Sequence, residues 1–143
     1  QQSASILIVR GKATGKIDDD VVMDLRVEDH PQPLAELRRL VNIQRAYALM
    51  NQGDAFLGKG DVPAAMQAYR TAASMAPEMD ELPFWHAVTL ADMGQVEESL
   101  PLFRAVFARN PDWALLLQRL PKAGLLNEDP AMMTRILSTA KRD

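Results

Sequence analysis

The feature that most constrains the fold of this chain is a constant interval between chemically similar residues. The pairs that show it are Gly60 and Gly94, Tyr69 and Phe103, and Pro77 and Pro111. The period is about 34 residues, within the range of roughly 20–50 residues that marks a repeat architecture in which each unit stacks on its neighbour. The spacing therefore predicts an array of helical hairpins, which typically presents a binding surface rather than a catalytic pocket.

Composition sets the class of protein. The chain has 143 residues, of which 48% are hydrophobic, so it can bury a core and form one ordinary domain or two small ones. The formal net charge is −3 and no basic stripe dominates, which argues against nucleic acid as the main partner. The sequence contains no cysteine, so disulfides and zinc sites with thiolate ligands are excluded.

Membrane and targeting signals are missing from the sequence. No apolar run reaches the roughly 18–20 residues that span a bilayer, so we expect no membrane partner. The first residues carry neither a basic segment nor a long apolar one, which is not the pattern of a signal peptide. The chain starts without Met, so we expect a fragment or a processed product. A cytoplasmic location is favoured, with an upstream signal left open.

Two strands are expected in residues 1–30. Residues 6–9 form a short, β-branched-rich run that is typical of a strand buried on both faces. Residues 21–28 alternate in the way of a half-buried strand. The turn-rich connection at 11–20 predicts an antiparallel hairpin. A lone hairpin is marginally stable in water, so we expect it to be completed by an upstream domain, by a second copy of the chain or by the helices that follow.

A long helix is expected after the hairpin. Pro31 and Pro33 lie at its start, where the first turn tolerates proline. Apolar residues then follow at helical spacing, which predicts a helix from about residue 33 to residue 57. Residues 31–45 would connect the hairpin to the repeats. The helix either runs straight into the first repeat or breaks near residues 42–45.

The two clearest repeats span residues 46–79 and 80–112. In each, a small residue lets two helices approach, a glycine turns the chain, and an aromatic residue of the second helix fills the space between the helices. The first repeat has Gly53, Phe56, Gly60, Ala65, Tyr69, Ala72 and Pro77 at these positions. The second repeat has Ala87, Leu90, Gly94, Ser99, Phe103, Val106 and Pro111. Pro83 replaces a large residue, so the first helix of this repeat is expected to begin near Pro83.

The third unit, residues 113–143, is expected to be a degenerate cap. Asp129 and Pro130 predict the start of a last helix, with the carboxylate as N-cap and the proline at the first position. If the register of the first two repeats continues, Leu137 and Ala140 occupy the core positions of that helix. Terminal repeats are commonly atypical because they close the stack.

This pattern resembles the tetratricopeptide repeat over about residues 46–140. The resemblance implies αα-hairpins stacked as a superhelix. With the strands that precede it, the expected fold is mainly α, a tetratricopeptide-like superhelix preceded by a two-stranded antiparallel β-hairpin. In such an array the first helices line a concave face that binds a protein or peptide segment.

The resemblance also implies which residues form this partner groove. They are Tyr47, Met50, Asp54, Leu57, Phe84, Val88, Ala91 and Asp92. Some members of the family clamp a C-terminal carboxylate with Lys, Arg and Asn at these places, and this chain has an apolar set instead. The expected ligand is therefore an apolar helix or strand of another protein, or part of the chain itself.

A second resemblance concerns residues 1–45. Residues 1–9 are similar to the C-terminal end of an uncharacterised bacterial family with an Ntn-hydrolase-like fold, filed as domain of unknown function 1028. So is the segment 24–40, where a strand, an Asp-His-Pro motif and a Leu-Arg-Arg helix follow one another. Membership would imply a four-layer αββα sandwich and an amide-bond hydrolase, of which this chain holds the last strands and the first tail helix. Gln1 is not a nucleophile, so that activity does not carry over to this fragment.

Candidate chemical sites are few. The acidic run 18–20 with Asp29 and His30 could be taken as a cation site. Its spacing lacks the alternation and the glycine of a calcium loop, so a solvated turn and a helix N-cap are favoured. His86 has no cysteine or placed acidic partner, so we expect a packed or groove-facing histidine. We predict no catalytic residue, no cofactor and no metal site in this fragment.

Two functions follow from these patterns. The first is a protein-interaction or self-association module in the C-terminal part of a larger bacterial protein. The alternative is an accessory or regulatory tail of an Ntn-type amide hydrolase whose catalytic part is not in this sequence. A homodimer through the N-terminal hairpin is a further expectation, because unpaired strand edges can pair across a two-fold axis.

Overall fold

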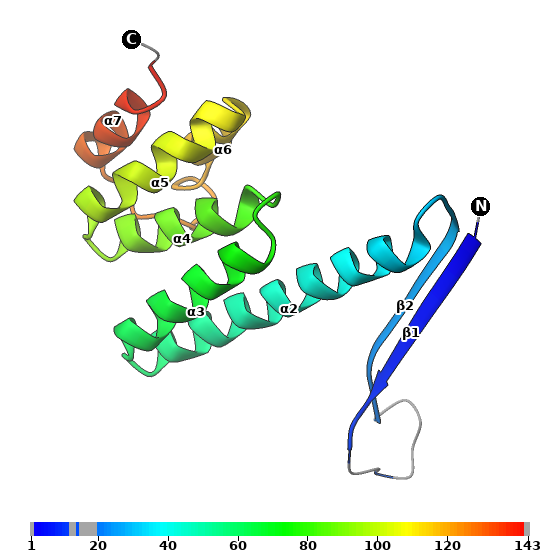
Figure 1. The fold of residues 1–143 in the computed structure, drawn as a ribbon. Coiled ribbons are helices and arrows are strands. Elements are labelled where there is room, and N and C mark those ends of the chain that lie inside the picture. Colours follow the sequence, from blue (N-terminus) through cyan, green and yellow to red (C-terminus); the bar gives the residue numbers. More distant parts are fainter. Residues whose placement is uncertain (1, 12–13, 15–19, 142–143) are drawn as a thin grey trace. The chain divides into compact units, whose positions relative to one another are not determined.

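A computed structural model describes residues 2–11, 14 and 20–141 of the chain. The chain divides into two compact units, Gln1–Ala48 and Leu49–Asp143. The expected class is confirmed: the protein is mainly helical and begins with a two-stranded antiparallel hairpin (Figure 1). Most of the connection between the strands, with Asp18 and Asp19 of the acidic run, lies outside the described residues.

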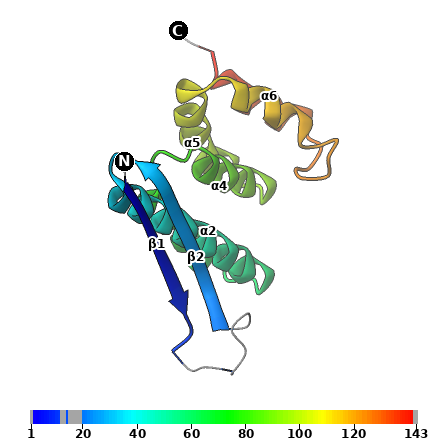
Figure 2. The same cartoon turned by 90° about the vertical axis from the view of Figure 1, so that its right-hand side faces the viewer.

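Strands β1 (Gln2–Val9) and β2 (Val21–His30) form the hairpin of the N-terminal unit, and they run side by side in opposite directions (Figure 2). The register places Ile6 opposite Leu25. Exposure alternates along both strands, which confirms the period of two expected for β2. Among the strand residues that the structure describes, only Val27 is buried.

The expectation that residues 6–9 are buried on both faces is wrong for this chain. Leu7 is 59% exposed and Val9 is 54% exposed. Successive side chains of a strand point to opposite faces of the sheet. In this two-stranded sheet one face is partly buried, and the other face is exposed to water. The apolar character of β1 thus exceeds what the hairpin itself can bury.

Helix α2 (Pro33–Gly58) is continuous, so the expected helix from residue 33 to 57 is confirmed and the break near 42–45 does not occur. The chain turns just after the helix at Gly60, whose φ of 78° is the left-handed conformation that glycine adopts without strain. The amide N–H of Gly60 donates to the carbonyl of Leu57 at 2.9 Å.

Further helices follow α2 in the C-terminal unit, and Figure 1 shows them as successive packed rods. They are α3 (Val62–Met75), α4 (Glu81–Asp92), α5 (Val96–Arg109), α6 (Asp112–Arg119) and α7 (Pro130–Ser138). The second helices α3, α5 and α7 begin at Val62, Val96 and Pro130, so the structure keeps the constant interval of the sequence. α4 begins at Glu81, close to the expected start, and Pro83 lies in its first turn, where proline costs no helical hydrogen bond.

The turn between the paired helices recurs with the same hydrogen bonds. Gly94 has a φ of 84°, close to the value of Gly60, and its N–H donates to Ala91 at 3.0 Å. Gly124 repeats the conformation with a φ of 75°, but it comes earlier in the chain than the interval between Gly60 and Gly94 would place it. The first helix of the third unit is therefore shorter, and the longer link from Gly124 to α7 restores the period of the second helices.

Apolar side chains from α4, α5, α6 and α7 share one core. Its largest fully buried members include Phe84, Phe103, Leu117 and Ile136. A second cluster joins the end of α2 and α3 to Leu90 of α4, and Tyr69 is its largest buried member. The aromatic position of each repeat thus fills the space between helices, as the spacing predicted.

The core register expected for α7 is wrong by one residue. Ala140 is exposed and Leu137 is only partly buried, whereas Met132 and Ile136 face the core. The first residue of α7 still follows the 34-residue interval, because the carboxylate of Asp129 caps the helix by accepting the N–H of Met132 at 3.0 Å. One residue corresponds to a rotation of about 100° about the helix axis, and that rotation turns Met132 and Ile136 inward.

Candidate functional site

The expected groove begins on α2, where the structure gives its residues different roles. Met50 and Leu57 are partly buried and pack against the cluster around Tyr69. Asp54 is exposed, and its carboxylate accepts the hydroxyl of Tyr69 at 2.5 Å. Tyr47 is half-buried in the same helix but belongs to the N-terminal unit. This half of the predicted set is thus largely committed to internal packing.

Three of the four groove residues expected on α4 are buried in the structure. Phe84, Val88 and Ala91 are 0%, 4% and 2% exposed. They belong to one buried cluster with residues of α5, α6 and α7. α4 packs chiefly against α5, and the ring centroids of Phe84 and Trp113 lie 4.7 Å apart. Leu126 of the link before α7 joins the same cluster, so the chain's own residues bury this part of α4.

Asp92 holds this cover in place. Its carboxylate accepts the backbone N–H of Asn127 at 2.8 Å, and its own carbonyl accepts the side-chain amide of Asn127 at 3.2 Å. The two bonds join the end of α4 to the link before α7. The structure thus places other parts of the chain against Phe84 and beside Asp92.

Burial shifts the pKa values of two titratable side chains in the helical unit, His86 and Tyr69. His86 is 7% exposed, and its ring centroid lies 5.4 Å from that of Tyr69. Burial lowers the pKa of His86 to about 4, and the positive charge of Arg70 adds to the effect. Burial, with the neighbouring carboxylate of Asp54, raises the pKa of Tyr69 above its ordinary value. His86 is therefore a neutral packed histidine near pH 7, as expected.

An arginine joins the two repeats. Arg109, the last residue of α5, pairs with the carboxylate of Asp80 at 2.9 Å. Its guanidinium also donates to the carbonyl of Pro77 at 2.9 Å. Pro77 and Asp80 lie in the link between α3 and α4, so this contact fixes the step from one helix pair to the next.

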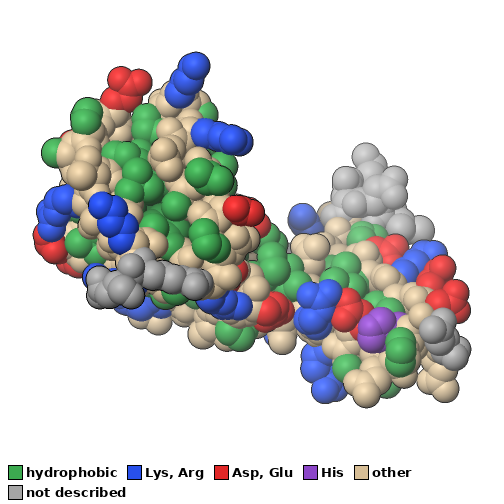
Figure 3. Space-filling view, turned by 90° about the horizontal axis from the view of Figure 1, so that it is seen from above, with side chains coloured by type: hydrophobic (Ala, Val, Ile, Leu, Met, Phe, Trp, Pro, Cys, Tyr) green, Lys and Arg blue, Asp and Glu red, His purple; other side chains and the backbone are tan. Residues whose placement is uncertain are grey.

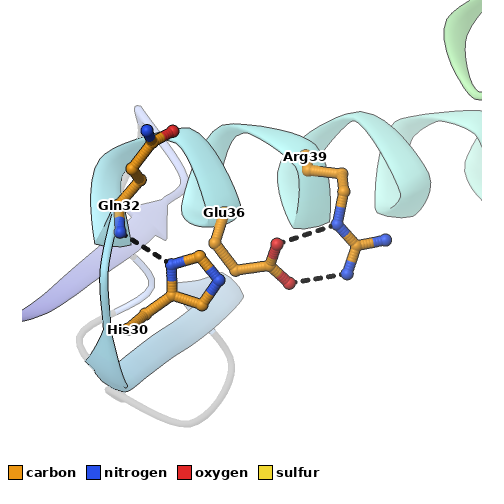
Figure 4. A network of polar contacts seen from close by, with 4 residues as sticks. All are labelled: His30, Gln32, Glu36 and Arg39. Atoms are coloured by element: carbon orange, nitrogen blue, oxygen red, sulfur yellow. Dashed lines mark hydrogen bonds and ion pairs between the residues drawn. The ribbon is translucent and has the colours of Figure 1, made fainter.

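In the N-terminal unit, polar side chains organise the start of α2 (Figure 4). Nδ1 of His30 accepts the backbone N–H of Gln32 at 2.9 Å, just before α2 begins. Arg39 donates to both carboxylate oxygens of Glu36, at 2.6 Å and 2.9 Å. The contact with Arg39 lowers the pKa of Glu36. These contacts make His30, Glu36 and Arg39 part of a polar network at the start of α2.

The outward face of the hairpin exposes several apolar side chains. Leu7, Val9 and Val22 are 59%, 54% and 60% exposed. An open hollow of about 500 Å³ runs along the same strands and is lined by residues 3–7 and by Asp24, Arg26, Val27 and Glu28. Figure 3 shows that hydrophobic side chains also reach the surface elsewhere, between charged ones. The sequence shows that β1 is apolar and uncharged, but it does not indicate that Leu7 and Val9 are exposed.

Metal-binding and membrane-spanning features are absent from the part of the chain that the structure describes. Residues 2–11, 14 and 20–141 contain no group of three or more His, Asp or Glu side chains that could hold a metal ion. None of the helices among these residues is both long and apolar enough to cross a bilayer. Asp20, the described member of the acidic run, accepts the N–H of Thr14 at 2.7 Å.

Comparison with known proteins adds no family to this picture. No family model, no curated protein and no solved structure matches the chain.

Proposed function

We propose that this chain is a protein-interaction or self-association module, in which the helical repeats are the scaffold and the hairpin is the binding element. The observation that carries the proposal is the hairpin: its described strands bury a single residue, Val27, and leave three apolar side chains more than half exposed. An apolar strand at the edge of a sheet is a template for pairing with another chain. Exposed apolar surface of this kind commonly marks an interaction site.

The helical unit supports this division of roles. Its apolar face on α4 is already covered through Phe84, Trp113 and Leu126, and Asp92 holds the cover. We infer that residues 46–143 form a tetratricopeptide-like stack, supported by the constant spacing of α3, α5 and α7 and by the turns at Gly60 and Gly94. A stack closed in this way is a rigid support, and the hairpin is left as the open surface.

One observation favours a second candidate function, an accessory tail of an Ntn-type amide hydrolase. Strand β1 is apolar on both faces along its second half, as a strand inside a larger layered sheet would be. In that case the partner of the hairpin would be the sheet of the hydrolase domain. The described residues supply no catalytic group to this proposal, and the chain would act by attachment or regulation.

Peptide selection tests the proposed function. The purified chain, immobilised through its C-terminus, is exposed to a display library of random dodecapeptides, and enriched peptides are titrated by calorimetry. The proposal predicts enrichment of apolar strand-forming or helix-forming sequences, with binding weakened when Leu7→Lys is introduced and unchanged with Leu115→Lys, a similarly exposed leucine of α6. Absence of any enriched sequence, together with a monomeric chain, would contradict it.

A further inference from the structure

We propose that β1 is a self-pairing strand: its free edge pairs antiparallel with β1 of a second copy, about a two-fold axis close to Ile6. The two hairpins then form one four-stranded sheet in the order β2, β1, β1, β2. This inference rests on the proposed interaction module and names its partner as another copy of the same chain.

The two edges of the hairpin differ in how they are protected. β1 has the sequence QSASILIV, which contains no charged residue and no proline. In the sheet of the described residues β1 pairs with β2 alone, so one row of its backbone N–H and C=O groups faces away from the ladder. Natural edge strands are usually shielded by charges, proline or bulges, because a bare edge invites another strand. β1 has a bare edge of this kind along its apolar half.

β2 carries the protection that β1 lacks. Asp24, Arg26 and Glu28 stand on its exposed face, at every second residue. Asp29 has a φ of 50°, a conformation that bends the end of the strand. The register also shifts between the pairs that contain Gln2 and Ala4, which marks a bulge at this end of the hairpin. The pairing edge is therefore β1.

A second copy of β1 is a complementary partner for this edge. When Ile6 of one copy lies opposite Ile6 of the other, Ser5 lies opposite Leu7 and Ala4 lies opposite Ile8. Each pair combines a small or apolar residue with an apolar one, and no like charges meet, which is the condition for stable cross-strand pairs. The apolar face of Ile6, Ile8 and the half-buried residues of β2 then doubles in width across the axis. An isologous contact of this type closes on itself and gives a dimer.

Sedimentation equilibrium of the purified chain tests the pairing. The apparent mass of the wild type is expected to rise toward twice 15.9 kDa as the chain concentration increases over roughly 1–100 µM, because a modest interface with a dissociation constant in the micromolar range fills across it. The double variant Ser5→Lys/Leu7→Lys places lysines of the two copies opposite each other and is expected at 15.9 kDa. Val22→Lys adds a charge at an equally exposed apolar site on β2 and is expected to stay dimeric. A monomeric wild type overturns the proposal, and so does a dimer that Val22→Lys disrupts as strongly as the β1 variant.

Variants of opposite charge distinguish a lost dimer contact from a failure to fold. Ser5→Glu/Leu7→Glu is also expected to be monomeric, and an equimolar mixture with the lysine variant is expected to restore a dimer that contains one copy of each. If the mixture stays monomeric while each variant keeps the helical circular dichroism of the wild type, the pairing of β1 edges is wrong.

A disulfide reports the register directly. The chain has no cysteine of its own, so Ile6→Cys introduces a single thiol close to the proposed axis. Directly opposite residues in antiparallel strands approach within the Cα separation that a disulfide spans. Mild oxidation is expected to link Ile6→Cys into a covalent dimer much faster than Gln2→Cys, and equal rates would overturn the register. If these tests fail, the self-pairing of β1 is wrong. The proposed binding of other proteins is tested separately by peptide selection, which does not depend on a second copy of the chain.

Discussion

Gly53 and Tyr69 lie so close together that a Cβ atom added to Gly53 would stand 2.5 Å from Cε1 of the tyrosine ring. Tyr69 is 1% exposed, and its hydroxyl is tied to Asp54, so the ring has little freedom to move aside. This contact explains a glycine in the interior of α2, where glycine costs about 1 kcal/mol relative to alanine. The contact joins α2 to α3.

Gly53→Ala is therefore expected to lower the free energy of unfolding by about 1–3 kcal/mol, because the cost of overpacking exceeds the gain in helix propensity. Urea denaturation followed by circular dichroism measures the change. Gly58→Ala is the matched control: it lies in the same helix, has no atom within 4 Å of the added Cβ, and is expected to be neutral or stabilising. Equal effects of the two substitutions would show that the contact with Tyr69 is not limiting.

Gly94→Ala is expected to cost about 1 kcal/mol, since an alanine at a φ of 84° adopts the left-handed conformation that L-residues with a Cβ disfavour. The space around Gly94 is open, so the backbone is the sole source of the cost. Gly94→Asn should lose less than Gly94→Ala, because asparagine tolerates this conformation better. Thermal unfolding of the two variants ranks them, and the reverse order would contradict the turn geometry.

Stability is expected to fall as the pH is lowered through the range set by His86. The folded pKa of His86 is about 4 against an ordinary value of 6.5, so the unfolded chain binds more protons between these values. The contribution of the buried neutral imidazole is thus complete above pH 6.5 and is lost as the pH falls toward 4. The expected loss is on the order of 2–3 kcal/mol.

His86→Gln isolates this effect, because both proteins share the titration of all carboxylates. The difference between the unfolding free energies of wild type and His86→Gln is expected to shrink as the pH is lowered from neutral toward the folded pKa of His86. A difference that does not change with pH would show that His86 titrates alike in the folded and unfolded states.

The link before α7 is expected to loosen when its contact with α4 is removed. Asp92→Ala deletes the acceptor of the Asn127 N–H and should cost about 0.5–1 kcal/mol, with faster hydrogen exchange of that amide. Asp92→Asn removes the same negative charge but keeps an acceptor oxygen, so it is the control and should retain most of the protection. Equal exchange in both variants would mean that the bond to Asp92 does not hold the link.

Much of the fold could be predicted because its signals are local. The glycine turns, the proline stop after α3, the Asp129 cap and the alternation of β2 each depend on a few neighbouring residues. The partner groove could not be predicted in the same way. Whether Phe84 and Val88 face solvent depends on how α5, Trp113 and Leu126 pack against α4, and some of these contacts join segments far apart in the sequence.

The rotation of α7 could not be predicted from the sequence for a related reason. The repeat period fixes where the helix starts, but the side that faces the core depends on the longer link after Gly124. The exposure of Leu7 was missed because an apolar strand indicates burial without indicating which molecule supplies it. The surplus of apolar surface on β1 is the physical basis for the proposed function.

Hydrogen exchange of the β1 amides at two chain concentrations tests the central claim, that the free edge of β1 is the binding surface. In a lone hairpin, alternate amides of an edge strand point to solvent and exchange fast. We predict that all amides from Ala4 to Ile8 become protected as the concentration rises, while the amides of α5 stay unchanged. Fast exchange of alternate β1 amides at every concentration would contradict the account.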